Sequence, residues 1–168
     1  MLCCNRSVRW PCRPHRNEYQ NKKQSGGTVR TGRLRECTVA TVLIIEDNPH
    51  NMKLARFLLE NAGYTALQAS DAQAGIALAR MHRPDIILMD IQLPGMDGLA
   101  ATQVIKADAG LRHSKVFALT AFAMKGDEDK IRAAGCDGYI AKPFNYRMFL
   151  ETIAAALPAG ATVDLQGE

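Results

Sequence analysis

Five side chains capable of charge or hydroxyl chemistry follow short apolar runs that are typical of buried strands. They are Glu46, Asp47, Asp90, Thr120 and Lys142. In a parallel sheet the carboxyl ends of the strands share one edge, so these side chains are expected to meet there. Three neighbouring carboxylates repel one another unless a cation binds. A hard divalent ion with oxygen ligands such as Mg²⁺ fits that role, and because Mg²⁺ also binds phosphate oxygens the group indicates phosphoryl chemistry.

Asp90 is the expected phosphate acceptor, because it ends the central strand between the acid pair and Lys142. A carboxylate can attack phosphorus and form an acyl phosphate. The metal, the Lys142 ammonium and the Thr120 hydroxyl would then share the charge of the phosphoryl oxygens. Each residue alone has an ordinary explanation as a helix start, a strand former or a surface lysine. Their coincidence at one rim is what favours a functional site.

The apolar runs that position these residues alternate with segments of helical spacing. The predicted strands are Thr41–Ile45, Tyr64–Ala69, Asp85–Met89, Val116–Thr120 and Gly138–Ala141. The continuous apolar character of the first run is that of a strand buried on both faces. Strict alternation of five strands with five helices predicts an α/β fold, a doubly wound parallel sheet with helices on both faces.

Capping and breaking residues set the predicted helix ends. Asn48 and Pro49 begin the first helix, and Gly63 ends it. Asp71 caps the second helix, which runs to about Met81. The remaining helices are expected after the turn 94–98, over about 125–134, and after Pro143 with Phe149, Ile153 and Leu157 on its inner face.

The 168 residues divide into a basic leader and a weakly acidic remainder. Residues 1–38 hold nine Lys and Arg residues and two acids, a net charge of +7, whereas residues 39–168 hold twelve and fifteen, a net charge of −3. We expect 1–38 to be disordered, 39–157 to form the domain, and 158–168 to be a short flexible tail. The basic excess belongs to the leader and gives no reason to expect the domain to bind nucleic acid.

The leader has two competing explanations. It is rich in Arg and poor in acids, as transit peptides are, but it lacks a clear amphipathic pattern. Alternatively, the start was assigned too far upstream. The next methionine after Met1 is Met52, inside the domain, so a later start would use a non-methionine codon such as that of Val39. We expect the leader to be dispensable for phosphorylation.

Cysteine usage and hydropathy exclude other classes of protein. An odd count of five cysteines without an export signal argues against a disulfide framework. A metal site in the leader is disfavoured because its candidate ligands lack paired spacing; these are Cys3, Cys4, Cys12 and His15. No apolar stretch approaches the roughly 18 residues of a membrane span. We therefore expect a cytoplasmic protein.

Four sequence blocks resemble the signature blocks of response-regulator receiver domains, the CheY-like family. They are IIEDN at 44–48, LMDIQLPGMDG at 88–98, ALTA at 118–121 and KPF at 142–144. The resemblance extends from about Val39 to Leu157. The first block with Asn51, together with GCDGY at 135–139, resembles the single-domain regulators of the DivK type. The resemblance implies a flavodoxin-like strand order, 2-1-3-4-5, with five helices.

The resemblance also implies ligands and a phosphodonor. Glu46 and Asp47 would bind Mg²⁺ together with Asp90 and the backbone carbonyl of Gln92. Asp90 would accept phosphate from a histidine kinase or a histidine phosphotransfer protein. The chain must turn sharply to aim the lysine of Lys142–Pro143 at this site, which together with the resemblance predicts a cis peptide bond.

The resemblance also assigns a second set of residues to signal output and its lifetime. Thr120 and Lys142 would hold the phosphoryl group and transmit its presence, with Tyr139 as the switch aromatic. A downstream protein would bind the surface formed by the fourth helix, fifth strand and fifth helix. Gln92 and Phe122 stand at the mouth of the site, where an attacking water must pass. Because the ring of Phe122 can exclude water, we expect slow self-dephosphorylation. Alternatively, Phe122 is part of the partner-binding surface.

Two rival functions are disfavoured by particular residues. Aspartyl-phosphate phosphatases carry a second Asp two positions after the nucleophile, where this chain has Gln92. A phosphorylation-independent binding module would be favoured by loss of an acid, the Thr or the Lys, and all are present. We therefore expect a single-domain response regulator that is not an enzyme, but assists its own Mg²⁺-dependent phosphorylation and dephosphorylation.

Overall fold

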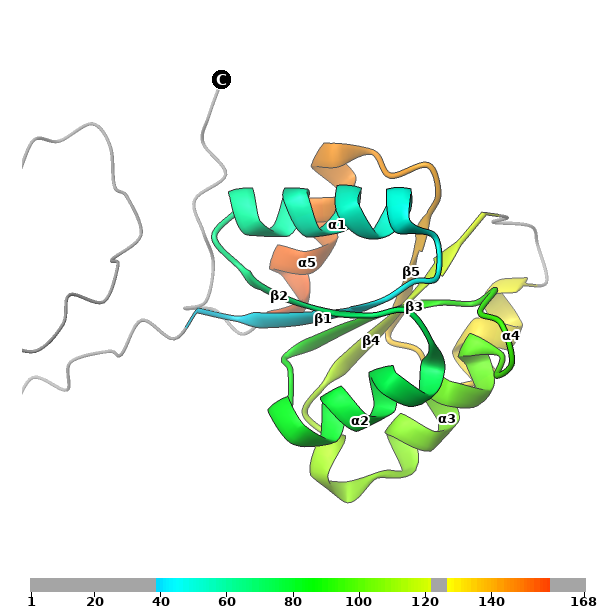
Figure 1. The fold of residues 1–168 in the computed structure, drawn as a ribbon. Helices are drawn as coiled ribbons and strands as arrows, with labels where there is room; N and C mark the ends of the chain where they lie inside the picture. Colours follow the sequence, from blue (N-terminus) through cyan, green and yellow to red (C-terminus); the bar gives the residue numbers. More distant parts are fainter. Residues whose placement is uncertain (1–38, 122–126, 158–168) are drawn as a thin grey trace, which may run out of the picture. The chain divides into compact units, whose positions relative to one another are not determined.

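The computed structural model describes residues 39–121 and 127–157, and these contain one five-stranded sheet in the order β2-β1-β3-β4-β5 (Figure 1). Each neighbouring pair of strands is parallel. The strands are β1 (Thr41–Ile45), β2 (Thr65–Ala69), β3 (Ile86–Asp90), β4 (Lys115–Thr120) and β5 (Gly138–Ala141). The predicted flavodoxin-like, doubly wound parallel sheet is confirmed.

Helices cover both faces of the sheet. In Figure 1, α1 and α5 lie on one face, and α2 and α3 lie on the other, with α4 next to β5. The helices are α1 (Pro49–Asn61), α2 (Ala72–His82), α3 (Gly98–Ala107), α4 (Asp127–Ala133) and α5 (Tyr146–Ala156), with a 3₁₀ turn, η1 (Ala109–Leu111), after α3. None of the helices in the described part of the chain is long and apolar enough to cross a membrane.

The inner strand β1 is buried from both sides, as its continuous apolar sequence predicts. Val42 and Ile44 pack in the hydrophobic layer under α1 and α5, whereas Leu43 and Ile45 pack in the layer under α2 and α3. Successive side chains of a strand point to opposite faces, so the two layers share β1. The strand is thereby packed against both helical layers, which fixes the position of the backbone just before Glu46 and Asp47.

The predicted helix caps are present. The side chain of Asn48 accepts hydrogen bonds from the backbone N–H groups of His50 at 2.9 Å and Asn51 at 3.4 Å, with Pro49 in the first turn of α1. Asp71 accepts from the N–H of Ala74 at 2.8 Å at the start of α2. These bonds satisfy N–H groups that a helix cannot pair internally, so each helix starts at a defined residue after its strand.

The element boundaries differ from the sequence prediction by one or two residues. β2 begins at Thr65 because the N–H of Tyr64 donates to Leu59 at 3.0 Å and still belongs to the exit of α1. β3 includes Asp90, whose backbone stays in register with Leu119. The 3₁₀ turn η1 was not predicted, since its three residues carry no periodic pattern. The predicted fourth helix is described from Asp127 onward.

A small ion network holds the start of β5 against its neighbours. The Asp137 carboxylate accepts from Lys106 Nζ at 2.5 Å, from Lys115 Nζ at 3.2 Å and from the Val116 N–H at 2.9 Å. Burial by itself would raise the pKa of Asp137, but these hydrogen bonds outweigh it and hold the pKa below its usual value. The charged form of Asp137 therefore stabilises the fold.

We expect Asp137→Asn to destabilise the domain by about 1 kcal/mol at neutral pH, since partial exposure weakens a charge-assisted contact. The native pKa is lowered, so the stabilisation is complete above the unfolded pKa of about 3.9 and is lost as pH falls through the lower native value. Urea unfolding between pH 7 and pH 3 should show the two curves converging below about pH 4. Asp129→Asn on the exposed face of α4 is the matched control. A difference that stays constant with pH would contradict the role of the charge.

Candidate functional site

Three carboxylates meet at the carboxyl edge of the sheet. Glu46 and Asp47 follow β1, and Asp90 ends the neighbouring strand β3, where Ile45 is paired with Met89. Their carboxylate oxygens lie within 4.8 Å of one another. Glu46 and Asp90 are buried, with 2% and 5% of their surface exposed, whereas Asp47 is exposed. The site therefore has a buried wall of two acids and one acid facing the solvent.

Lys142 supplies the positive charge of this group. Its Nζ lies 2.8 Å from Asp90 Oδ2 and 2.6 Å from Glu46 Oε2. The Lys142–Pro143 peptide bond is cis, as the sequence predicted. From the end of β5, the side chain thus reaches the acids at the ends of β3 and β1. One ammonium cannot neutralise three carboxylates, so the site as a whole is acidic.

Thr120 ends β4 beside the lysine. Its side chain is buried, and in the strand register it is paired with Ala141. The N–H of Lys142 donates to the carbonyl oxygen of Thr120 at 2.7 Å. The backbone positions of Thr120 and Lys142 are therefore coupled directly, and a shift of one moves the other.

Burial governs the electrostatics of Glu46. Desolvation raises the pKa of Glu46, and outweighs the hydrogen bonds that oppose it from Lys142 and Asn51. The second of these joins Asn51 Nδ2 to Glu46 Oε1 at 2.9 Å. The Oε2 atom is buried, and its contact there is the ion pair with Lys142 rather than a well-directed hydrogen bond. This oxygen retains the capacity to bind a further positive charge.

The donor set fits a hard divalent cation. Among the described residues, Glu46, Asp47 and Asp90 form a cluster that offers oxygen ligands at metal-binding separation. Carboxylate oxygens without sulfur or imidazole favour Mg²⁺ or Ca²⁺ over Zn²⁺. The buried Oε2 of Glu46 supports the same conclusion, because a cation would offset a charge that is costly to bury.

Of the other candidate residues, Gln92 contacts the acidic cluster directly, whereas Tyr139 contacts α4. The N–H of Gln92 donates to Asp90 Oδ1 at 3.0 Å, and the Gln92 residue is exposed at the rim. Tyr139 is 39% exposed, and its hydroxyl donates to Glu128 Oε1 at 2.6 Å, which raises the pKa of Tyr139. The aromatic ring is thus held outward against α4. Phe122 lies outside the described residues.

The loop between Asp90 and α3 is closed by backbone contacts that the sequence did not predict. The N–H of Gly98 donates to the carbonyl oxygen of Ile91 at 3.1 Å, and the Thr102 hydroxyl donates to the carbonyl oxygen of Gly98 at 2.9 Å. A Cβ atom at position 98 would lie 1.9 Å from the Asp90 carbonyl oxygen. Only glycine allows this approach, so Gly98 fixes the start of α3 directly against the end of β3.

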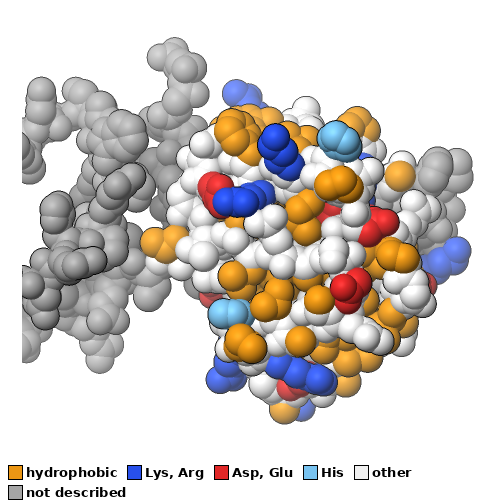
Figure 2. Space-filling view, viewed as in Figure 1, with side chains coloured by type: hydrophobic (Ala, Val, Ile, Leu, Met, Phe, Trp, Pro, Cys, Tyr) orange, Lys and Arg blue, Asp and Glu red, His pale blue; other side chains and the backbone are white. Residues whose placement is uncertain are grey.

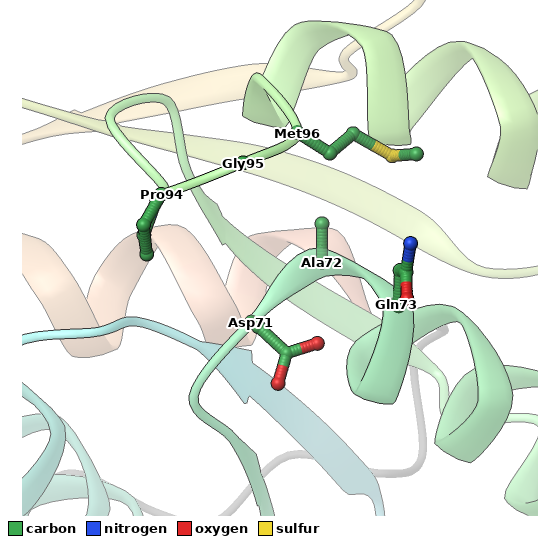
Figure 3. A pocket seen from close by; sticks show the side chains of 6 residues that line it. All are labelled: Asp71, Ala72, Gln73, Pro94, Gly95 and Met96. Carbon is green, nitrogen blue, oxygen red and sulfur yellow. The ribbon is translucent and has the colours of Figure 1, made fainter.

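A shallow depression lies between this loop and the start of α2 (Figure 3). Its lining residues are Asp71, Ala72, Gln73, Pro94, Gly95 and Met96. The Asp71 carboxylate is already used as the cap of α2. On the face of the domain shown in Figure 2, acidic, basic and apolar side chains are interspersed among the described residues.

Comparison with known proteins identifies the class. The description "response regulator receiver domain" applies to the family that matches residues 42–154. The chemotaxis protein CheY4 of Vibrio cholerae has the same fold, with a TM-score of 0.69 and 26% identity, covering 71% of this chain and 100% of that chain. The receiver domain of a sensor histidine kinase from Pseudomonas aeruginosa, described with a magnesium ion coordinated in the active site cleft, has a TM-score of 0.66 and 34% identity, covering 70% and 97%. The fold and the match define a CheY-like receiver domain.

A closer sequence relative is the polar-differentiation response regulator DivK of Brucella anthropi. It is 52% identical over 117 residues, which is 70% of this chain and 95% of the relative. The chain belongs to the response regulator receiver family. It is a signalling regulator of two-component phosphorelays rather than a catalyst of metabolism. Receiver domains bind Mg²⁺ in the active site, and the acidic cluster occupies the corresponding edge of this sheet.

Proposed function

We propose that Asp90 accepts a phosphoryl group from the phosphohistidine of a histidine kinase or a histidine phosphotransfer protein. The observation that carries this proposal is the contact between Asp90 Oδ2 and Lys142 Nζ at 2.8 Å, within the cluster of three acids. A carboxylate oxygen of Asp90 attacks phosphorus, the phosphorus–nitrogen bond breaks, and the donor imidazole keeps the electron pair. The product is an acyl phosphate on Asp90.

The remaining residues of the cluster prepare that transfer. Glu46, Asp47 and Asp90, with the backbone carbonyl of Gln92, are the proposed ligands of Mg²⁺. When bound, the ion supplies positive charge that offsets the phosphoryl oxygens. Lys142 is held close enough to Asp90 to contact an oxygen of a phosphoryl group there. The chain thus assists its own phosphorylation without turning over a substrate.

A small acyl phosphate tests this function, because it needs no partner protein. Full-length chain with Mg²⁺ is expected to be labelled with one phosphoryl group, as measured by intact mass. Excess chelator is expected to abolish labelling, and restored Mg²⁺ should recover it. Equal labelling with and without chelator would contradict the metal-assisted mechanism, and no labelling under any condition would contradict the phosphoacceptor function.

Signal output is proposed to pass from Thr120 to Tyr139. The Thr120 hydroxyl would bond a phosphoryl oxygen and move inward, and the Tyr139 ring would leave Glu128 and follow. A phosphoryl group shifts this equilibrium only through different contacts in the two states. The surface that would change comprises α4, β5 and α5, where a downstream protein is proposed to bind.

We expect Thr120→Ala to separate phosphate uptake from output. The variant keeps Asp90 and Lys142 and should still be labelled, but the NMR signal of the Tyr139 ring should no longer change on phosphorylation. Thr65→Ala, at the exposed start of β2 on the opposite edge of the sheet, is the matched control and should respond as the wild type does. A normal Tyr139 response in Thr120→Ala would show that the hydroxyl is not the link.

Three further parts of the proposal rest on the sequence alone. Gln92 and Phe122 are proposed to control access of water to the acyl phosphate, and the expected result is slow self-dephosphorylation. Residues 39–157 are proposed to form the functional receiver, with 1–38 dispensable for phosphorylation. A cytoplasmic location, with no binding to nucleic acid, completes the proposal.

A further inference from the structure

Glu46 differs from the other two acids of the cluster in how its carboxylate is held. Its two oxygens have separate partners, Asn51 Nδ2 at 2.9 Å on Oε1 and Lys142 Nζ at 2.6 Å on Oε2. Glutamate has one more rotatable bond than aspartate, so its carboxylate needs an additional contact to be held in one place. Asn51 provides that contact from a different element, α1.

Asn51 is itself firmly placed. It lies in the first turn of α1, and its N–H donates a hydrogen bond to Asn48 Oδ1 at 3.4 Å. The next N–H, of Met52, donates to the carbonyl oxygen of Asn48 at 3.0 Å. A polar side chain at this helical position often turns back to the cap residue's own N–H. Here the amide of Asn51 instead contacts Glu46, so the helix start is used to position a residue of the site.

We propose that Asn51 is a positioning residue for the divalent-cation site, an inference that rests on the proposed Mg²⁺ binding by Glu46. By occupying Oε1, the Asn51 amide directs Oε2 toward Asp90 and Lys142. An amide donates hydrogen bonds without competing as a charge, so it orders the carboxylate while leaving the acidity of the cluster intact. Without Asn51, binding of the cation would have to order the Glu46 side chain itself.

The expected effect is on affinity for the cation. Loss of a residue that orients a metal ligand typically weakens binding by about 10- to 100-fold. Because Asp47 and Asp90 remain in place, we expect Asn51→Ala to weaken Mg²⁺ binding by about tenfold, the low end of that range. Phosphorylation should recover when Mg²⁺ is raised to saturation, since the acceptor and Lys142 are unchanged.

Calorimetric titration of the full-length chain with Mg²⁺ measures this directly. Asn61→Ala makes the same substitution at the far, exposed end of α1 and is the matched control. Wild type and Asn61→Ala should bind Mg²⁺ alike, and Asn51→Ala should bind it about tenfold more weakly. The midpoint of thermal unfolding without Mg²⁺ should be nearly the same in the three proteins. A loss of Mg²⁺ affinity without a loss of stability would separate positioning of Glu46 from disruption of the fold. Equal affinity in all three proteins would overturn the inference, whereas failure of the wild type to bind Mg²⁺ would overturn the proposed metal site itself.

A second background tests whether Asn51 acts through Glu46. Glu46→Asp keeps a carboxylate but shortens the side chain by one carbon–carbon bond, roughly 1.5 Å, so the contact with Asn51 is lost. In the Glu46→Asp background, Asn51→Ala should change the Mg²⁺ affinity by less than about twofold, because coupled residues are not additive. The same tenfold loss in both backgrounds would show that Asn51 acts through the helix rather than through Glu46.

Discussion

Replacement of Asp90 by asparagine is expected to abolish labelling by a small acyl phosphate. The amide carries no negative charge and is a poor nucleophile, so no acyl phosphate can form. The fold should persist, since asparagine keeps the shape of the side chain and Lys142 retains its contact with Glu46 at 2.6 Å. Intact mass after incubation measures labelling, and thermal unfolding measures the fold.

Asp97→Asn is the matched control for this experiment. Asp97 lies in the same loop after β3, is exposed, and caps α3 by accepting from the Leu99 N–H at 3.0 Å. Asparagine is an equally good cap, so this variant should be labelled as the wild type is. Labelling that persists in Asp90→Asn, with the added mass found on Asp47 or elsewhere, would show that Asp90 is not the acceptor.

Gly98→Ala is expected to have the largest effect on stability, about 3 kcal/mol or more. The added Cβ would lie 1.9 Å from the carbonyl oxygen of Asp90 and 2.8 Å from its carbonyl carbon. Both are backbone atoms of Asp90, so they cannot move aside as the end of a flexible side chain can. The loop must open or β3 must shift, and phosphorylation should fall together with stability.

Gly95→Ala, in the same loop, distinguishes steric contact from general sensitivity of the loop. Gly95 has a φ of +84°, but nothing lies within 4 Å of a Cβ built there. The cost should be only that of a left-handed residue, about 1–2 kcal/mol, with the acceptor undisturbed. Urea unfolding of both variants checks the difference. If Gly98→Ala proves no more destabilising than Gly95→Ala, the close approach to Asp90 is not what constrains this position.

Most of the fold could be predicted because its signals are local. A short, continuous run of apolar and β-branched residues such as Thr41–Ile45 favours a strand buried on both faces, and Asn48 with Pro49 marks a helix start within two residues. Strict alternation of such elements leaves few topologies, since parallel strands need crossover helices of one hand. The grouping of residues at the carboxyl edge then follows from topology and needs no knowledge of side-chain conformation.

The contacts that refine the site could not be predicted in the same way. Asn51 lies five residues after Glu46, and its amide reaches that carboxylate only because α1 leaves β1 at a particular angle. The sequence predicts only that Gly98 belongs to a turn, because its close approach to Asp90 depends on how the whole loop folds back. The outward position of Tyr139 depends on Glu128 of α4, which is adjacent only in three dimensions. Each depends on the relative placement of two elements, which residue spacing does not encode.

The strands that carry the site differ in how many neighbouring strands they pair with. Its acids belong to β1 and β3, each paired on both sides, whereas Lys142 follows β5, which within the described sheet is paired only with β4. Edge elements open locally at a lower free energy than central ones, so amide hydrogen exchange should be slow along β1 and β3 and faster along β5. The proposed acceptor, Asp90, can therefore keep its position while Lys142, at the less protected edge, samples other arrangements. The proposed phosphate acceptance by Asp90 and the proposed response through β5 thus depend on different parts of one sheet, and substitutions can alter one without the other.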